Sequence, residues 1–217
     1  NGLTIKTICF DEKRNCIWFG GIEFLKQLNL VNNAITDFPD IQSVDLNTKE
    51  IINAIYLSKS DQLWITSNFG IKIKNPNNNN SIYLKNQLEN QNSLSTNNIT
   101  CLAEDSNGVW IGTYNGGINL FDKKTNAIIR INNPILSGLE IASIYTSGNG
   151  KLWISSNKGI YKYNIASNEC NEFGAAFGIK NYNFNPNSFY VGKSGYTYWG
   201  GNNSIISFHP DSLESKY

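Results

Sequence analysis

One pattern recurs five times along the 217-residue chain, each time around an aromatic residue. Consecutive copies lie 46, 46, 43 and 45 residues apart. A period of this length is typical of stacked repeat architectures, in which one unit cannot bury its apolar faces alone and must pack against its neighbours. The repeat therefore constrains the fold more than any other feature. Its aromatic anchors are Trp18, Trp64, Trp110, Trp153 and Tyr198.

The residues around each anchor predict four short strands per repeat. Two apolar columns stand nine and eight residues ahead of the anchor, as Cys9 and Phe10 do before Trp18, and predict a first strand. The anchor lies in a second strand, which a turn rich in asparagine and glycine follows. Residues 118–121 and 127–131 show the third and fourth strands of one repeat. Four antiparallel strands about every 45 residues predict a β-propeller blade.

The predicted fold is all-β, with about five four-stranded antiparallel blades over residues 1–217 as a single domain. Long windows of helix-forming residues are missing, so an α/β fold has little support. We expect the five anchors to be buried between blades. We also expect a partial propeller, because the chain leads almost directly into its first strand and no fourth strand is evident after Phe208.

Charge and residue usage exclude several function classes. A net charge of +1 gives no basic surface for nucleic acid, and no apolar run approaches the length that spans a bilayer. One histidine, His209, and four distant cysteines do not supply a metal site or a Ser-His-Asp triad. We therefore expect no catalytic residue, no metal and no cofactor.

The four cysteines leave the disulfide state open. Cys9 and Cys101 occupy a column that is otherwise apolar, so both are predicted to be small buried side chains. Cys16 lies close enough along the chain to pair with Cys9 within one hairpin. No pattern assigns a partner to Cys170, and the redox compartment stays undecided.

Two stretches, residues 105–122 and 150–163, resemble the two-component regulator propeller repeat. The consensus of that family is close to D-x-x-G-x-L-W-I-G-T-x-x-G-L, and the first stretch reads DSNGVWIGTYNGGINLFD. Residues 187–210 are similar to the closing repeat of the second sensor propeller in hybrid two-component histidine kinases, with Ser204 in place of the usual glycine.

The resemblance implies a non-enzymatic, ligand-sensing propeller fragment from the periplasmic part of an inner-membrane hybrid sensor histidine kinase. Such sensors typically respond to oligosaccharides and regulate genes for polysaccharide use. The implied partners are an oligosaccharide, the remaining propeller and immunoglobulin-like domains of the same chain, and a second copy in a homodimer. Nucleic acid is not an implied partner of this part.

Two alternatives remain open from the residues alone. A propeller-type glycoside hydrolase or lyase would need facing carboxylates, whereas Asp11, Asp61 and Asp105 all fall in predicted turns. A protein-interaction scaffold shares the features of the sensor and differs only in its partner.

The candidate ligand-binding residues lie in turns between second and third strands and in a long blade-to-blade connection. In a propeller these loops emerge on one face, and loops carry most binding functions. Aromatic rings offer flat apolar platforms for sugars, and asparagine both donates and accepts hydrogen bonds. A competing explanation is that the asparagines serve turn conformation and the rings pack under their own loop. The candidates are Asn68, Phe69, Tyr114, Asn115, Asn157, Lys158, Tyr182, Phe184, Asn202 and Asn203.

Overall fold

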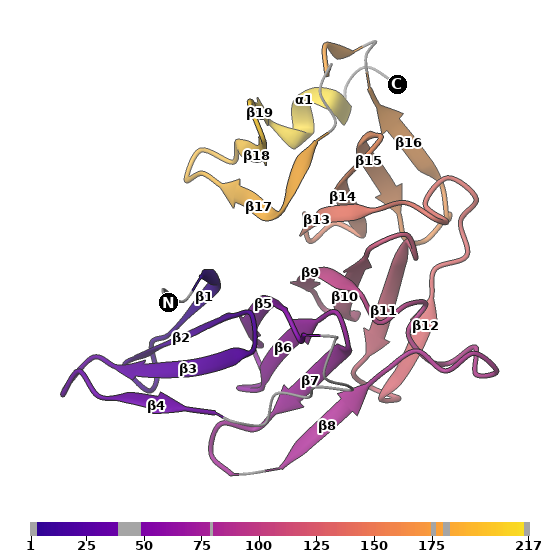
Figure 1. Cartoon of the computed structure of the whole chain (residues 1–217). Coiled ribbons are helices and arrows are strands. Elements are labelled where there is room, and N and C mark those ends of the chain that lie inside the picture. Colours follow the sequence, from indigo (N-terminus) through magenta and orange to yellow (C-terminus); the bar gives the residue numbers. More distant parts are fainter. Residues whose placement is uncertain (1–3, 39–48, 79, 175–176, 180–182, 215–217) are drawn as a thin grey trace. The chain divides into compact units, whose positions relative to one another are not determined.

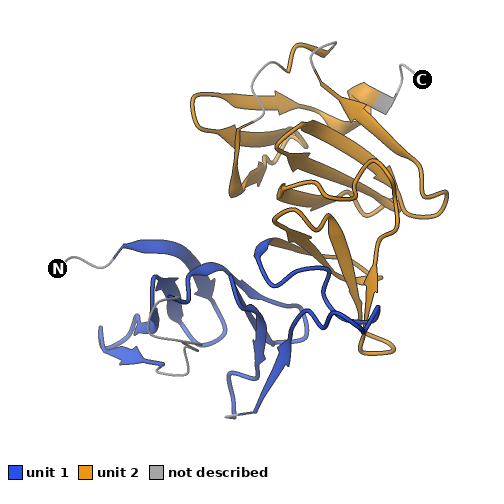
Figure 2. Cartoon of the chain, turned by 45° about the vertical axis from the view of Figure 1, so that its right-hand side comes forward, with its two compact units in different colours: residues 1–100 blue, residues 101–217 orange. Residues whose placement is uncertain are grey.

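The computed structural model describes residues 4–38, 49–78, 80–174, 177–179 and 183–214. It confirms an all-β chain of antiparallel propeller blades, with a single short helix in the described part, α1 (Pro210–Glu214) (Figure 1). The chain divides into two compact units, residues 1–100 and 101–217, which Figure 2 colours separately. Each unit is described by itself.

The first unit contains two four-stranded blades, each paired in simple sequence order. Blade 1 consists of β1 (Ile5–Asp11), β2 (Cys16–Gly21), β3 (Phe24–Asn29) and β4 (Ile35–Asp37). Blade 2 consists of β5 (Ile52–Leu57), β6 (Leu63–Ser67), β7 (Gly70–Lys74) and β8 (Ser81–Leu84).

The second unit contains the other three blades, the first of which starts at the unit boundary. Blade 3 consists of β9 (Ile99–Glu104), β10 (Gly108–Thr113), β11 (Ile118–Asp122) and β12 (Ala127–Arg130). Blade 4 consists of β13 (Ile141–Thr146), β14 (Lys151–Ser156), β15 (Gly159–Asn164) and β16 (Cys170–Phe173). Blade 5 consists of β17 (Phe184–Val191), β18 (Thr197–Gly201) and β19 (Ile205–Phe208).

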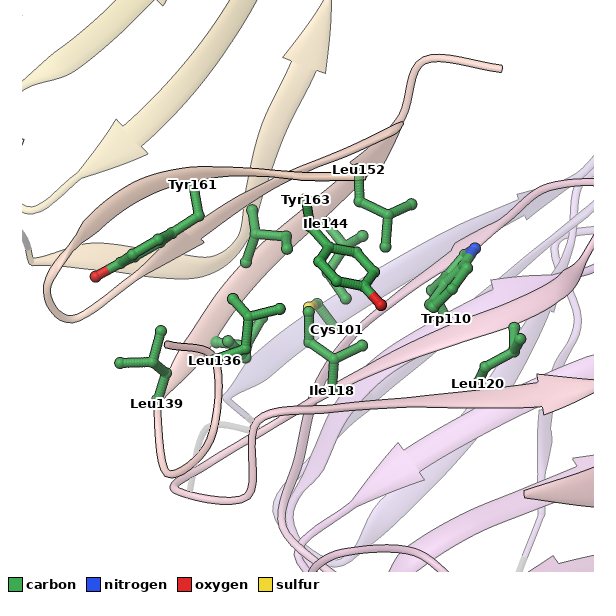
Figure 3. Close-up of a cluster of buried hydrophobic side chains, with 12 residues drawn as sticks. Cys101, Trp110, Ile118, Leu120, Leu136, Leu139, Ile144, Leu152, Tyr161 and Tyr163 are labelled. Carbon is green, nitrogen blue, oxygen red and sulfur yellow. The ribbon is translucent and has the colours of Figure 1, made fainter. Parts of the chain in front are cut away.

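Trp18, Trp110 and Trp153 each pack against the following blade of their own unit. Trp18 joins a cluster with Ile52 and Leu63 of blade 2. Trp110 joins a cluster with Ile144 and Leu152 of blade 4, which Figure 3 shows. Since side chains alternate along a strand, the residue after an anchor faces the other way, and Ile65 and Trp199 pack against the preceding blade of their own unit. Both faces of an inner strand are therefore apolar, as the repeat predicts.

Close approach between blades explains the small residues that follow the anchors. A Cβ atom added at Gly112 would collide with Cys101 Sγ of the same blade and lie 2.8 Å from a methyl carbon of Ile141 in the next blade. At Gly20 it would lie 2.9 Å from a methyl carbon of Ile52. These positions face the first strand of the next blade, so a larger side chain would force the two sheets apart.

The prediction that Tyr198 is a buried anchor is wrong. Tyr198 is 38% exposed, whereas its neighbour Trp199 is fully buried and packs with Trp153 and Phe173 of blade 4. Tyr198 holds the anchor position in the strand pairing, opposite Tyr190 as Trp153 is opposite Tyr145. Its face of blade 5 is turned away from blade 4, where it lies beside the exposed Tyr190, and no other described sheet of the second unit covers it.

The fifth sheet also differs from the expected four strands, because its described part has three. After β19 the chain reaches His209 and Pro210, and Pro210 begins α1. Proline has no N–H for a strand ladder but fits the first turn of a helix. The chain therefore leaves the sheet at this point.

All four cysteines are free thiols, so Cys9 and Cys16 do not form a disulfide in this structure. Cys101 is buried as predicted, while Cys9 is half-buried and packs against the cluster around Trp18. Burial, with a smaller contribution from Glu172, raises the pKa of the Cys170 thiol to about 12.

An ion-pair network joins the first turns of blades 1 and 2. The Arg14 guanidinium donates to Asp61 at 2.7 and 2.8 Å and to the buried Asp11 at 2.9 Å, while Lys13 Nζ donates to Asp61 at 2.6 Å. The hydrogen bonds from Arg14, followed by those from Lys13, hold the pKa of Asp61 well below its usual range. The network links two turns that are 47 residues apart.

We predict that Trp153→Ala lowers the free energy of unfolding by about 3–5 kcal/mol, because it removes a large aromatic side chain buried between blades 4 and 5. Tyr198→Ala is the matched control at the same strand position and should cost less than about 1 kcal/mol, because the ring is partly exposed. Urea titration followed by circular dichroism measures both. Equal losses would contradict the assignment of the buried anchor.

A second prediction concerns acid stability. Because the folded pKa of Asp61 lies below its unfolded value of about 4, its ion pairs stabilise the fold above that pH and stop doing so as the pH falls through the folded pKa. Arg14→Gln should therefore lower Tm at pH 7, and the difference from wild type should shrink toward pH 2. Thermal melts between pH 2 and 7 measure this, and a difference that stays constant would contradict it.

Candidate ligand-binding cavity

A polar cavity of about 180 Å³ lies between blades 4 and 5 in the second unit. It opens where the blade-to-blade connections and the turns between second and third strands come together. Three of the predicted residues meet around it, and four further residues complete the lining. The lining residues are Glu140, Ala142, Asn157, Asn183, Phe184, Asn185 and Asn202.

The blade pattern places these side chains. Asn157 lies in the turn between β14 and β15, and Asn202 lies in the equivalent turn between β18 and β19. Glu140 directly precedes β13, whose first residue pairs with the last residue of β14 and so lies near the same turn. Phe184 begins β17 and pairs with Gly201, next to Asn202. Asn157 and Asn202, which are 45 positions apart in sequence, therefore lie at the rim of the same cavity.

The two turn asparagines differ in how they are held. The backbone N–H of Glu140 donates to the side-chain oxygen of Asn157 at 3.4 Å. This oxygen therefore links the β14–β15 turn to the start of the same blade. The backbone N–H of Asn202 donates to the carbonyl of Asn183 at 3.0 Å, which fixes the turn. Within the described residues, no hydrogen bond engages the Asn202 side chain, which leaves its donors and acceptor for a ligand.

The cavity offers carboxamides, one carboxylate and one aromatic edge. Carboxamides both donate and accept hydrogen bonds, and the Glu140 carboxylate accepts them, so the set suits a ligand rich in hydroxyl groups. Phe184 is half-buried and packs against the cluster of Trp153 and Trp199, so it also supports the blade interface. Glu140 is the one carboxylate among the lining residues, whereas glycoside hydrolysis requires a pair.

The remaining candidates are not brought to this cavity. Tyr114, Asn115, Lys158 and Asn203 are exposed turn residues of the second unit that do not line it. Asn115 has a φ of 60°, a conformation that asparagine tolerates well and that explains its place in the turn. Tyr182 lies outside the described residues.

In the first unit, Asn68 and Phe69 have structural contacts. The Asn68 side chain accepts a hydrogen bond from the backbone N–H of Ile51 at 2.8 Å and donates to the carbonyl of Lys49 at 3.0 Å, so it ties the β6–β7 turn to the start of its blade. Phe69 is half-buried and lines a narrow apolar pocket with Ile52 and Ile71. Asn68 therefore has the structural role in its turn that was the alternative to sugar binding.

Sequence reasoning missed Glu140, Ala142, Asn183 and Asn185. The blade-to-blade connections differ in length and composition, so no repeated column points to them. The available signal was positional, since Glu140 directly precedes a predicted first strand and such residues lie beside the turn after the second strand.

The described residues contain neither a metal-binding cluster nor a membrane-spanning helix. No group of three or more His, Cys, Asp and Glu side chains is arranged to hold a metal ion in that part of the chain. No helix in the same residues has the length and apolarity needed to cross a membrane.

Comparison with known proteins agrees with the repeat pattern. Residues 93–115 match the family model described as two component regulator propeller. This stretch is therefore similar to a two component regulator propeller repeat. A curated relative, histidine kinase P4 from Formosa agariphila, is 23% identical over 92% of this chain.

Two solved structures from B. thetaiotaomicron share the fold, and both are described as extracellular domains of hybrid two component systems. The domain of BT3049 is 18% identical over 98% of this chain with a TM-score of 0.79, and that of BT4673 is 22% identical over 97% with a TM-score of 0.76. The chain spans 18% of the length of the curated relative and 29% and 30% of the two solved chains.

We predict that Asn68→Ala lowers the free energy of unfolding by about 1–3 kcal/mol, because it removes two side-chain hydrogen bonds to backbone groups. Asn202→Ala is the matched control in the equivalent turn and should change stability by less than about 0.5 kcal/mol. Thermal and urea unfolding measure both variants. A loss at Asn202 as large as that at Asn68 would show that its side chain also serves the fold.

Proposed function

We propose that the chain is a ligand-sensing propeller fragment of a hybrid two-component sensor histidine kinase, with an oligosaccharide as its ligand. The observation that carries this proposal is the polar cavity between blades 4 and 5, where Asn157, Phe184 and Asn202 meet. The regulator propeller repeat and the sensor relatives support the same class of protein.

A carbohydrate fits the chemistry of the cavity. Its walls present several carboxamides and one carboxylate but only one ring, which favours a ligand with many hydroxyl groups over an apolar one. The volume of about 180 Å³ holds a small part of an oligosaccharide, and the cavity is open to solvent. The rest of the ligand would then extend over the exposed turns that carry Asn203 and Lys158.

In this proposal the propeller lies outside the cytoplasm, in the periplasm, and belongs to a longer inner-membrane protein whose kinase regulates genes for polysaccharide use. Its described residues expose apolar side chains on two sheet faces: Ile8 and Phe10 in blade 1, and Tyr190 and Ile205 in blade 5. Exposed apolar sheet faces favour pairing. Other propeller and immunoglobulin-like domains of the same chain, or a second copy, would cover them.

The sensor itself is proposed to be non-catalytic. A glycoside hydrolase would need a second carboxylate facing Glu140, and the lining of the cavity provides none. The fragment would then signal by binding its ligand and changing how its blades pack.

The test is oligosaccharide binding by the 217-residue chain, measured by isothermal titration calorimetry against a panel of neutral and acidic glycan fragments. For the oligosaccharide that binds, Asn202→Ala and Glu140→Gln should each weaken affinity about 5- to 30-fold, as expected for one lost hydrogen bond to a ligand. Neither should lower Tm appreciably, because neither side chain supports a core contact.

Asn171→Ala is the control, because Asn171 is an exposed residue of β16 away from the cavity. Its affinity should equal that of the wild type. Unchanged affinity in both cavity variants would remove this cavity as the binding site, and no binding by any member of the panel would contradict the oligosaccharide assignment.

A further inference from the structure

Lys74 breaks the repeat at a buried position of blade 2. It is the last residue of β7 and pairs with Leu63, directly before the anchor Trp64. The strand pairing of the other four blades places an apolar residue at the same position. Those residues are Leu28, Phe121, Tyr163 and Phe208. The fold therefore does not require a lysine there.

The Lys74 side chain is buried without an ionic partner. It is 6% exposed, and within the described residues it forms no ion pair or side-chain hydrogen bond. Its ammonium lies 5.3 Å from the centre of the Phe38 ring, a cation–π contact that offsets part of the cost of desolvation. Burying an unpaired charge is unfavourable, so this lysine lowers stability relative to the apolar residues of the other blades.

Two carboxylates of the first unit, Asp11 and Asp61, are paired with other cations. Asp11 accepts from Arg14 at 2.9 Å, and Asp61 accepts from both Arg14 and Lys13. Arg14 also donates to the side-chain oxygen of Asn77, at 3.0 Å. Among the described residues, this network does not include Lys74.

A cavity of about 290 Å³ adjoins Lys74. Its lining combines the ammonium with two aromatic rings and three carboxamides, and it lies in the first unit at the end of blade 2 opposite the turn of Asn68. The rings of Trp18 and Phe38 have centroids 4.8 Å apart and form the apolar part of the wall. The cavity is lined by Trp18, Gln27, Phe38, Lys74, Pro76, Asn77 and Asn78.

Hydrogen bonds within the protein hold the three carboxamide side chains in place. Each carboxamide keeps one polar group that is free to bind a ligand. Asn77 and Asn78 each use the side-chain oxygen to accept a hydrogen bond, from Arg14 and from the backbone N–H of Asn80, so their amino groups remain as donors. Gln27 donates to Cys16 Sγ at 3.1 Å, so its oxygen remains as an acceptor. The site therefore presents one cation, two neutral donors and one acceptor beside an aromatic wall.

We propose that this cavity binds an acidic sugar residue, with the carboxylate of a uronate paired to the Lys74 ammonium. The carboxamides would bind ring hydroxyls, and Phe38 and Trp18 would contact an apolar face of the sugar. A volume near the lower end for small-molecule sites suits one monosaccharide unit. A free uronate and the uronate end of an acidic oligosaccharide share this chemistry. The site is separate in sequence and composition from the cavity between blades 4 and 5.

The test is isothermal titration of the 217-residue chain at low salt with sodium galacturonate, a digalacturonate, neutral galactose and sodium sulfate. The uronates should bind, with affinity falling as salt rises, and galactose should bind at least tenfold more weakly because it cannot form the ion pair. A digalacturonate that binds more tightly than the monomer identifies the oligosaccharide as the source of the ligand, and equal affinity identifies the free sugar.

Lys74→Met removes the charge while keeping an unbranched side chain, and it should abolish uronate binding or weaken it at least tenfold. It should also raise Tm, because it restores the apolar column, and Lys74→Phe should do the same. Lys72→Met, two residues away on the same strand and face, is the matched control and should bind uronate as the wild type does.

Retained binding in Lys74→Met, equal affinity for galactose, or binding of sulfate with no binding of uronate would each overturn the proposal. A failure here is distinguishable from a failure of the proposed function, because Asn202→Ala and Glu140→Gln lie in the other unit and should leave uronate binding at Lys74 unchanged.

Discussion

The packing of an indole side chain from one blade into the next sheet of the same unit is the interaction on which this structure depends. Trp18, Trp110 and Trp153 each fill the space in front of the following blade of their unit, and glycine at positions such as Gly20 and Gly112 lets the sheets approach closely enough to enclose them. A blade with two apolar faces cannot bury them alone, so this contact with the neighbouring blade adds stability that a single blade lacks. The positions of the turns and connections follow from the positions of the sheets, which the packing of the indoles determines.

Where the packing between blades changes, cavities open. Between blades 4 and 5 the contact of Trp153 with Trp199 closes the interior, and the polar cavity opens at the rim, where turns and connections have no core to fill. Between blades 1 and 2 a lysine replaces an apolar residue of the repeat, and a cavity lies beside it. The first cavity is lined by loop residues, and loops tolerate polar side chains. The second adjoins a core position where a lysine replaces an apolar residue, which lowers stability.

Asparagine serves two purposes in these turns, and sequence could not separate them. Asn68 and Asn202 occupy equivalent turns, yet Asn68 bonds to the backbone on both sides of its carboxamide, while within the described residues the Asn202 side chain forms no hydrogen bond. The repeat predicts the turn and its residue type, because positive φ and short loops favour asparagine and glycine. Whether the asparagine side chain hydrogen-bonds to the protein depends on the blade-to-blade connection that passes beside it. The sequences of these connections do not repeat from blade to blade.

The sequence by itself determined the fold class, the number of blades and the strand order, because a 45-residue period with alternating apolar residues has few other ways to bury its faces. It also determined which turns reach the face of the cavity between blades 4 and 5. Tertiary structure decided the buried anchor of blade 5, since Tyr198 and Trp199 are adjacent aromatics and burial depends on which side of the strand meets blade 4. It likewise decided that Asn157, Phe184 and Asn202 meet while Tyr114 does not, and that Lys74 lies unpaired beside a cavity. Those outcomes depend on contacts between side chains far apart in sequence, which the period of a repeat does not encode.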